Sequence, residues 1–297
     1  MKSFVSTLTF SLLLVGATVF GQGYTFKVMA NKGANEVKSG NEWKPLKTGA
    51  SLKEGDELKI TSNAYLALIH NTGKTLELKD EGNHKVDVLA SKFSGGGSSV
   101  ASKYADFVLS KMSVEGDKNR LSATGAVHRG SVTAGINVYV PTSVEVFNND
   151  ALLEWSALEG EKVYEVIVLN MFGDELLKME TTDSNYMLDL KDPKFTSEMA
   201  LLVTIGVKGE EETKSEEVAI KILPVDKAEL VKQNLGELMG EVNTETALNN
   251  YILAGFYEEN RLLLDALFYY EEAKRLAPGV ESYNEAYEEF LFRNGLN

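Results

Sequence analysis

The stretch from Thr246 to Pro278 constrains the fold most strongly, because small and aromatic residues recur along it at the spacing of two packed helices. Ala266 and Ala273 are seven residues apart, so they lie on one helix face, two turns from each other. Tyr270 lies between them and can pack into a neighbouring helix. Pro278 has no backbone N–H and ends the second helix. The stretch therefore predicts an antiparallel helical hairpin.

The same residues resemble a tetratricopeptide repeat, in which two antiparallel helices cross at small residues. The resemblance implies packing and interaction roles for Leu253, Tyr257, Ala266, Tyr270 and Ala273, with Pro278 as the helix stop. The chain departs from the family at Asn250, where a Trp is common, and at Ala254, where a Gly is common and here follows at Gly255. Only one repeat is clear, so two arrangements stay open: a peptide-binding groove, or a structural bundle that serves as a docking surface.

Four helices are expected after Pro224, and they form a helical domain over residues 224–297. They run from a cap at Asp226 to Met239, from a cap at Thr244 or Thr246 to Glu259, from Arg261 to Leu276, and from Glu281 to Arg293. Since the last helix closes the series, we expect a docking segment attached to two β domains rather than a long array.

Residues 136–223 contain seven strand candidates at fairly regular spacing, which is typical of a β-sandwich. The candidates are Ser143 to Phe147, Ala151 to Trp155, Tyr164 to Leu169, Glu175 to Met179, Tyr186 to Leu190, Ala200 to Lys208 and Glu217 to Leu223. The phrase LLEWSALEGEKVYEVIVLN resembles the second and third strands of a fibronectin type III-like or Ig-like domain, which implies that Trp155 is a buried core aromatic. The acidic run Glu210 to Glu212 is expected in a solvated hairpin loop.

Residues 22–93 alternate between apolar and polar positions and predict a half-buried antiparallel β module. Its clearest strands are Glu57 to Thr61, Tyr65 to Ile69, Thr75 to Leu78 and Lys85 to Val88. The order of Trp43, Pro45-Leu46, Gly49, Leu52, Gly55-Asp56, Leu58, Ala64, Leu66, Leu68, Gly73 and Leu76 resembles a FecR-like domain. That resemblance implies a periplasmic β module used in signalling or contact.

Between the two β regions, residues 94–135 begin with a Gly- and Ser-rich run and are expected to be a flexible linker. Within it, Val100 to Met112 could form a short amphipathic helix, with one face made of Ala105, Val108, Leu109 and Met112. The fold class is therefore mainly β with a C-terminal α-helical domain: a β module, a β-sandwich, and a helical hairpin or bundle.

The first 21 residues carry the pattern of a secretory signal peptide. Lys2 gives a basic start, Phe10 to Val15 anchors a short apolar core, and Val19 and Gly21 are small residues ahead of a cut before Gln22. The chain has no cysteine, which excludes disulfides, thiol nucleophiles and lipid attachment at the cut. These features favour a bacterial protein that is periplasmic or secreted, with no membrane span after signal removal.

Composition argues against several functions. The net charge of -14 disfavours nucleic acid as a partner, because acidic surfaces repel phosphates. The histidines His70, His84 and His128 are far apart and form no HExxH pattern, and no Gly-x-Ser-x-Gly motif is present. We therefore nominate no catalytic, cofactor-binding or metal-binding residue, and we do not expect an enzyme.

Two functions remain from the sequence. The leading hypothesis is an exported scaffold or adaptor that makes protein–protein contacts with envelope proteins. The alternative is a carbohydrate- or peptidoglycan-binding module, with Trp43 as the glycan platform. Exposure of Trp43 beside other aromatic rings would favour the alternative, whereas burial of both tryptophans would disfavour it.

Overall fold

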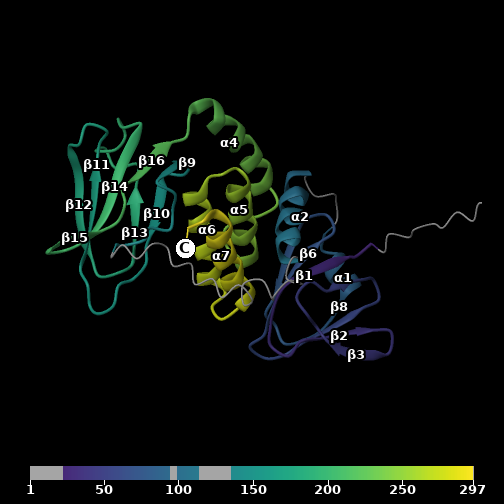
Figure 1. The fold of residues 1–297 in the computed structure, drawn as a ribbon. Coiled ribbons are helices and arrows are strands. Elements are labelled where there is room, and N and C mark those ends of the chain that lie inside the picture. Colours follow the sequence, from purple (N-terminus) through teal and green to yellow (C-terminus); the bar gives the residue numbers. More distant parts are fainter. Residues whose placement is uncertain (1–22, 94–98, 114–134, 297) are drawn as a thin grey trace, which may run out of the picture.

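A computed structural model describes residues 23–93, 99–113 and 135–296 of the chain. It confirms the fold class, with largely antiparallel sheets over the first two thirds of the chain and helices at its C-terminal end. Figure 1 shows the helices between two β regions rather than at one end of the molecule. Within the described ranges, none of the helices has both the length and the apolar character needed to cross a membrane.

The first β module, residues 23–93, contains two four-stranded sheets, ordered β4-β1-β6-β7 and β3-β2-β5-β8. The elements are β1 (Phe26–Lys32), β2 (Glu36–Ser39), β3 (Glu42–Pro45), β4 (Ser51–Leu52), β5 (Glu57–Ile60), β6 (Tyr65–His70), β7 (Thr75–Leu78), β8 (Gly82–Lys85) and α1 (Val86–Ala90). The expected strand from Lys85 to Val88 is wrong, because β8 ends at Lys85 and the short helix α1 follows at once.

Strand β6 connects the first β module to the helices, because its side chains are buried on both faces. We expected it to be half-buried, but all six of its residues are buried. Leu66 and Leu68 belong to the module's own core, whereas Tyr65, Ala67 and Ile69 belong to the large core shared with the helices. Alternate side chains of a strand point to opposite faces, so this one strand contributes to two cores.

The second β module, residues 135–223, has a six-stranded sheet and a two-stranded sheet, an arrangement compatible with the expected sandwich. Its strands are β9 (Ser143–Val146), β10 (Asp150–Glu154), β11 (Tyr164–Leu169), β12 (Glu175–Thr181), β13 (Asn185–Asp189), β14 (Ala200–Val207), β15 (Glu210–Lys214) and β16 (Val218–Ile222). The order is β12-β11-β14-β16-β9, with β15 paired to β14, while β10 pairs with β13. Trp155 is buried and packs edge-on to Tyr164 at 5.5 Å.

One expectation for this module is wrong. Glu210 to Glu212 lie in β15, not in a loop, because the turn at Gly209 folds them back onto β14. The three carboxylates stay exposed on that strand, so their solvation does not prevent backbone pairing.

The helices are α2 (Ser99–Ser113), α4 (Val225–Met239), α5 (Ala247–Glu259), α6 (Leu263–Leu276) and α7 (Glu281–Asn294). Thr246 caps α5, since its side chain accepts a hydrogen bond from the N–H of Asn249 at 3.2 Å. Asp226 does not cap α4: Pro224 precedes that helix, and Asp226 lies in its first turn.

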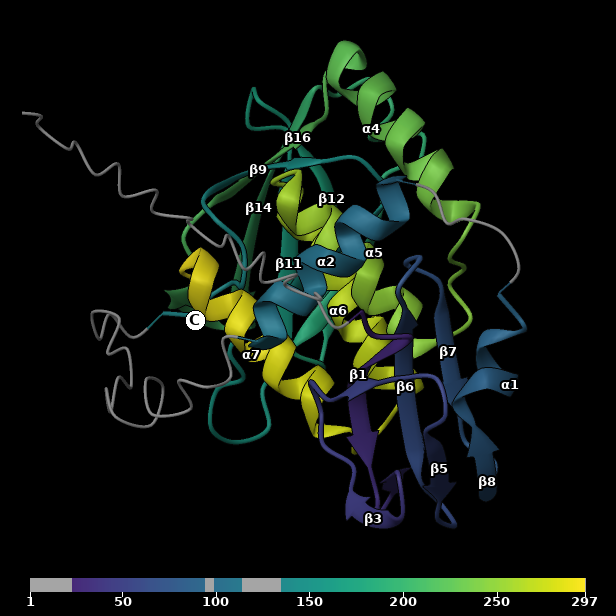
Figure 2. The ribbon, with the colours of Figure 1, turned by 90° about the vertical axis from the view of Figure 1, so that its right-hand side faces the viewer.

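Helix α2 is more than part of a linker. Its residues Ala101, Tyr104, Ala105 and Val108 are buried in the large core, where α2 packs against α5 (Figure 2). The remainder of the expected linker, residues 94–98 and 114–134, lies outside the described residues, as does the expected signal segment.

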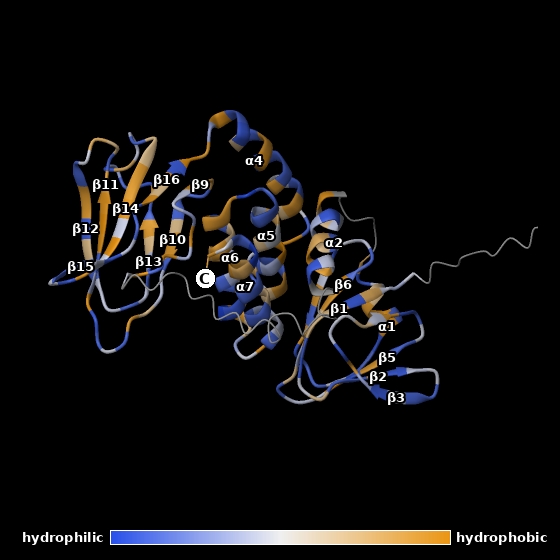
Figure 3. Cartoon of the chain, in the orientation of Figure 1, coloured by the Kyte–Doolittle hydropathy of each residue, from blue (hydrophilic) through white to orange (hydrophobic). Residues whose placement is uncertain are grey.

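One hydrophobic core runs through all three parts of the molecule. It includes Met29 and Ala67 of the first β module, Leu253 of α5, and Trp155 and Val166 of the second β module. Figure 3 shows orange, apolar residues in the strands of both β modules and in the helices between them. The helices therefore form a central layer, which we call the helical layer, between the two β modules.

Candidate functional site

The five residues predicted for helical packing and interaction, Leu253, Tyr257, Ala266, Tyr270 and Ala273, are all buried in the α5–α6 hairpin. Tyr257 stacks on Tyr269 with ring centroids 5.1 Å apart, and Tyr270 stacks on Phe290 of α7 at 4.7 Å. The structure brings these residues together as packing contacts and leaves none of them free to contact an external partner.

Helix α5 has no open face. Its residues from Ala247 to Glu258 are buried, because α6, α2 and β7 contact it from different directions. At Gly255 a side-chain carbon would come within 3.0 Å of Val108 and 3.1 Å of Phe107, both on α2. A groove for a peptide needs one accessible helix face, and α2 occupies the face that α5 would offer.

The first β module is joined to the helical layer through Glu77 of β7. Its Oε1 accepts a hydrogen bond from the Tyr65 hydroxyl at 2.6 Å and from the N–H of Leu248 at 2.9 Å. The Tyr65 and Tyr283 hydroxyls are 2.7 Å apart, which ties β6 to α7. Leu248 lies in the first turn of α5, so the Glu77 carboxylate caps that helix and interacts favourably with its dipole.

The second β module is joined to the helical layer through Asp265 of α6. This fully buried carboxylate accepts hydrogen bonds from the N–H groups of Phe147 at 2.9 Å and Asn148 at 2.8 Å. Both donors lie in the turn between β9 and β10. Burial raises the pKa of Asp265 to about 6, and the backbone donors act in the opposite direction because they favour the charged form.

A second contact to this module is formed by Glu154 of β10, which accepts a hydrogen bond from the Tyr287 hydroxyl of α7 at 2.9 Å. Burial, and then the negative charge of Glu271, raise the pKa of Glu154 to about 7. Glu288 adds to the rise, whereas Tyr287 and Lys274 oppose it.

Lys274 of α6 lies beside the contact between Glu154 and Tyr287. Its ammonium pairs with Glu271 at 2.6 Å and lies 3.7 Å from the centre of the Tyr287 ring. The pair and the cation–π contact keep one positive charge beside three carboxylates, those of Glu154, Glu271 and Glu288.

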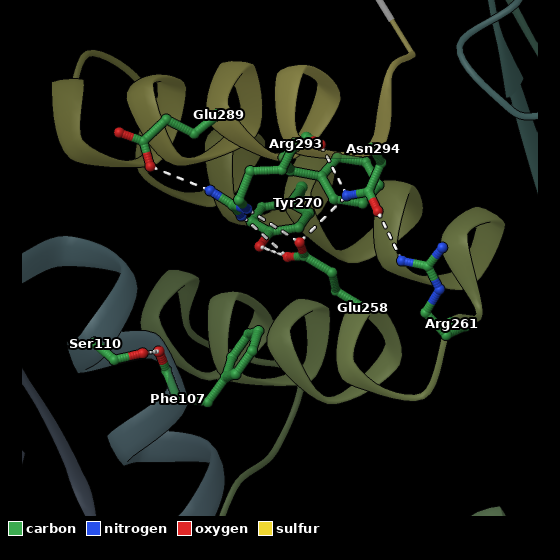
Figure 4. A network of polar contacts seen from close by, with 9 residues as sticks. Phe107, Ser110, Glu258, Arg261, Tyr270, Glu289, Arg293 and Asn294 are labelled. Carbon is green, nitrogen blue, oxygen red and sulfur yellow. Dashed lines mark hydrogen bonds and ion pairs between the residues drawn. The ribbon is translucent and has the colours of Figure 1, made fainter. Parts of the chain in front are cut away.

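Glu258 joins the three C-terminal helices to each other (Figure 4). Its carboxylate accepts hydrogen bonds from the Tyr270 hydroxyl at 2.7 Å, from Arg293 at 3.1 Å and from Asn294 at 3.2 Å. Arg293 pairs in addition with Glu289, one turn back on α7. A buried carboxylate with several charge-assisted partners holds α5, α6 and α7 in one geometry.

Sequence reasoning missed Glu77, Asp265 and Glu258. For Asp265 a signal existed, since the run LLLDALF places one carboxylate among apolar residues of a helix. A charge at such a position is rarely buried without partners, so it indicates a fixed polar contact.

Trp43, the predicted glycan platform, lies on the edge strand β3 and is 36% exposed, with the Lys38 ammonium 5.9 Å from its ring centre. Among the described residues no aromatic ring packs beside it, whereas Trp155 is buried in the core. The structure therefore shows one exposed tryptophan on its own.

The histidines are not gathered into a site. His70 stacks on Phe93 and contacts Phe26 in the first β module, His84 lies near the Asp80 carbonyl, and His128 is outside the described residues. In the part of the chain that the structure covers, no group of three or more His, Asp or Glu side chains could hold a metal ion.

A scan of protein-family models finds no match to the chain, and a search of curated proteins finds no significant similarity. Function is therefore inferred from the geometry of the chain itself.

Proposed function

We propose that this protein is an exported, non-enzymatic scaffold or adaptor that holds two β modules in a fixed relation and contacts envelope proteins through them. The bacterial periplasm, or secretion from the cell, fits the signal-like first residues and the lack of cysteine. We further propose that the three parts are FecR-like, fibronectin type III-like or Ig-like, and tetratricopeptide-like.

The observation that carries this proposal is the enclosure of α5. A repeat-type hairpin that bound a peptide would leave α5 open, but here α5 is buried between the other helices and β7. Polar contacts at both ends of the helical layer, through Glu77 and Asp265, then fix the two β modules. Both modules keep exposed surface that partners can contact, for example at Val88 and Phe172.

Photocrosslinking in living cells tests the proposal. Photoreactive p-benzoylphenylalanine replaces, one at a time, the exposed residues Trp43 and Val88 in the first module and Phe172 and Glu217 in the second. We expect irradiation-dependent adducts with envelope proteins from at least one position in each module. Absence of protein adducts from all four positions, with the protein correctly exported, would contradict the proposal.

The glycan-binding alternative is supported only by the exposure of Trp43. It predicts that the mature protein sediments with purified peptidoglycan, that Trp43→Ala abolishes sedimentation, and that Trp43→Phe preserves most of it, because a ring face is what a sugar would contact. If the protein stays in the supernatant at all concentrations, the alternative is excluded.

A further inference from the structure

One end of the second β module, together with the start of α4, carries large apolar side chains that nothing in the described structure covers. Phe172 is 90% exposed, Met199 85%, Val225 76%, Met171 62% and Ile222 45%. We call these five residues the apolar end. Exposed apolar side chains that gather at one place on a protein are typical of an interaction site.

Strand register brings these residues together. Leu169, the last residue of β11, pairs with Leu202, so the hairpin tip that follows it lies alongside the start of β14. The Ile222 N–H donates to the Met199 carbonyl at 3.2 Å, which places the end of β16 beside the same point. Figure 1 shows the β11–β12 hairpin, the start of β14 and the end of β16 at the same end of the module, where α4 begins at Val225.

The hairpin tip is fixed in the shape that exposes Phe172. The side-chain carbonyl of Asn170 accepts hydrogen bonds from the N–H groups of Phe172 and Asp174, both at 2.9 Å. Gly173 has a φ of 89°, a conformation that glycine adopts without strain. A tip already held in one conformation loses little entropy when a partner binds.

The charges next to the apolar end are mainly negative. Asp174 and Glu175 follow the tip, Glu198 precedes Met199, and Asp226 follows Val225. Within the described ranges none of these four carboxylates forms an ion pair.

The two lysines that are closest in sequence to Ile222 and Val225 compensate for little of this charge. Lys227 pairs with Glu145 at 3.1 Å, and Lys221 precedes Ile222 on β16 and so points to the opposite face of the sheet. The apolar end therefore has an acidic rim.

We propose that the apolar end binds a protein segment whose apolar side chains are flanked by lysine or arginine residues. Apolar contact supplies the binding free energy, and the acidic rim selects a basic partner and repels an acidic one. A second copy of this chain would bring the same acidic rim and an anionic lipid surface would bring negative charge, so both are disfavoured. This inference rests on the proposed function and names the surface and the partner chemistry for it.

The test uses p-benzoylphenylalanine at Phe172 in the full mature chain, with the same substitution at Phe292 of α7 as a control. Phe292 is also an exposed phenylalanine but lies on the helical layer. We expect a protein adduct at Phe172 and none at Phe292, and mass spectrometry should locate the linked residue in an apolar segment with basic neighbours. At an ionic strength of about 1 M, where charges act over only ~3 Å, the adduct yield should fall several-fold.

A second substitution tests whether the adduct at Phe172 reports binding at the apolar end rather than chance proximity. In the Phe172 probe background, Met199→Asp should lower the adduct yield on the order of tenfold, because a charge replaces a central apolar contact. Met239→Asp, at an exposed methionine near the end of α4, should leave the yield unchanged and serves as its control.

The remaining outcomes overturn the inference. They are an adduct between two copies of this chain, an adduct whose partner segment is acidic, flotation of the purified protein with phosphatidylcholine vesicles, or no adduct at Phe172. If Phe172 gives none while Glu217 and a first-module position give protein adducts, this inference fails and the proposed function stands. If no position on either module gives a protein adduct, both fail.

Discussion

At the scale of single residues, buried carboxylates hold the parts of this protein together. Asp265 satisfies two backbone N–H groups of the β9–β10 turn, and Glu77 satisfies one at the start of α5. Each replaces partners that the backbone would otherwise need from water. Removing such a carboxylate therefore affects a junction and not only a side chain.

We predict that Asp265→Ala destabilises the protein by roughly 2–4 kcal/mol, because the N–H groups of Phe147 and Asn148 lose their acceptor in a buried place. Asp265→Asn keeps one acceptor oxygen and should cost about half as much. Asp80→Ala, at an exposed position, should change the free energy of unfolding by less than about 0.5 kcal/mol. Urea unfolding of the three variants measures these differences, and equal stability of Asp265→Ala and Asp80→Ala would contradict the prediction.

Glu154 should make the junction with the second module sensitive to pH. Its pKa rises from an ordinary value of 4.5 to about 7, so the folded state binds this proton more tightly than the unfolded state does. The resulting stabilisation is fully present below about pH 4.5 and is lost as the pH rises through 7. Acidification from pH 8 to pH 5 should therefore stabilise this junction.

Glu154→Gln is the matched test, because the glutamine can still accept the Tyr287 hydrogen bond but carries no charge. At pH 8 we expect the free energy of unfolding of the variant to equal that of the parent or to exceed it by on the order of 1 kcal/mol. This value is smaller than the pKa shift alone would give, because solvent reaches part of the side chain and screens its charge. Its stability should also change less between pH 8 and pH 5. The exposed Glu217→Gln should follow the parent profile throughout, and a Glu154→Gln profile parallel to the parent would rule out the assignment.

At the scale of secondary-structure elements, the crossing of α2 and α5 determines whether the helical hairpin is enclosed. Gly255 allows the two helices to approach, since a side chain there would meet Phe107 and Val108. Gly236 of α4 provides a contrast, because nothing lies within 4 Å of the place where its side chain would be.

We predict that Gly255→Leu destabilises the protein by about 1–3 kcal/mol or more, because the leucine forces α2 away from α5. Gly236→Leu should be neutral or stabilise the protein by up to ~1 kcal/mol. At an exposed helix position, leucine has a higher helix propensity than glycine. Thermal unfolding followed by circular dichroism compares the two variants. Similar melting temperatures for both would show that α2 does not pack on α5 as described.

Sequence periodicity predicted the elements well where the signal is local. The strand from Tyr164 to Leu169 and the end of α5 at Glu259 match the structure, because alternation and helical spacing depend on neighbouring residues. It failed for α1 after Lys85 and for β15, where a buried core or a partner strand outweighs local propensity.

The site was harder to predict, since its partners are far apart in the chain. Phe147 precedes Asp265 by 118 residues, and Tyr65 precedes Tyr283 by 218. No local pattern reports such pairs. The two apolar faces of β6 were visible as the run YLALI, but that run does not say which elements cover the second face.

At the scale of the whole molecule, the helical layer is a central element and not a terminal docking segment. The core continues from Met29 through Leu253 to Trp155, so separating the modules would expose apolar surface on both. A truncation at Leu223 would remove α4 to α7, most of the helical layer, rather than an appendage, so function must be mapped with surface substitutions in the full chain.

The distance between the two β modules tests the central claim most directly, and the absence of native cysteine makes the measurement clean. Spin labels at Val88→Cys and Glu217→Cys measure the distance between the two modules across the helical layer. Labels at Lys191→Cys and Glu217→Cys give the width of the distance distribution expected within one module. We predict one distance between the modules, with a distribution as narrow as that of the reference pair. A broad distribution, or several distances, would show that the helical layer does not fix the modules and would contradict the account.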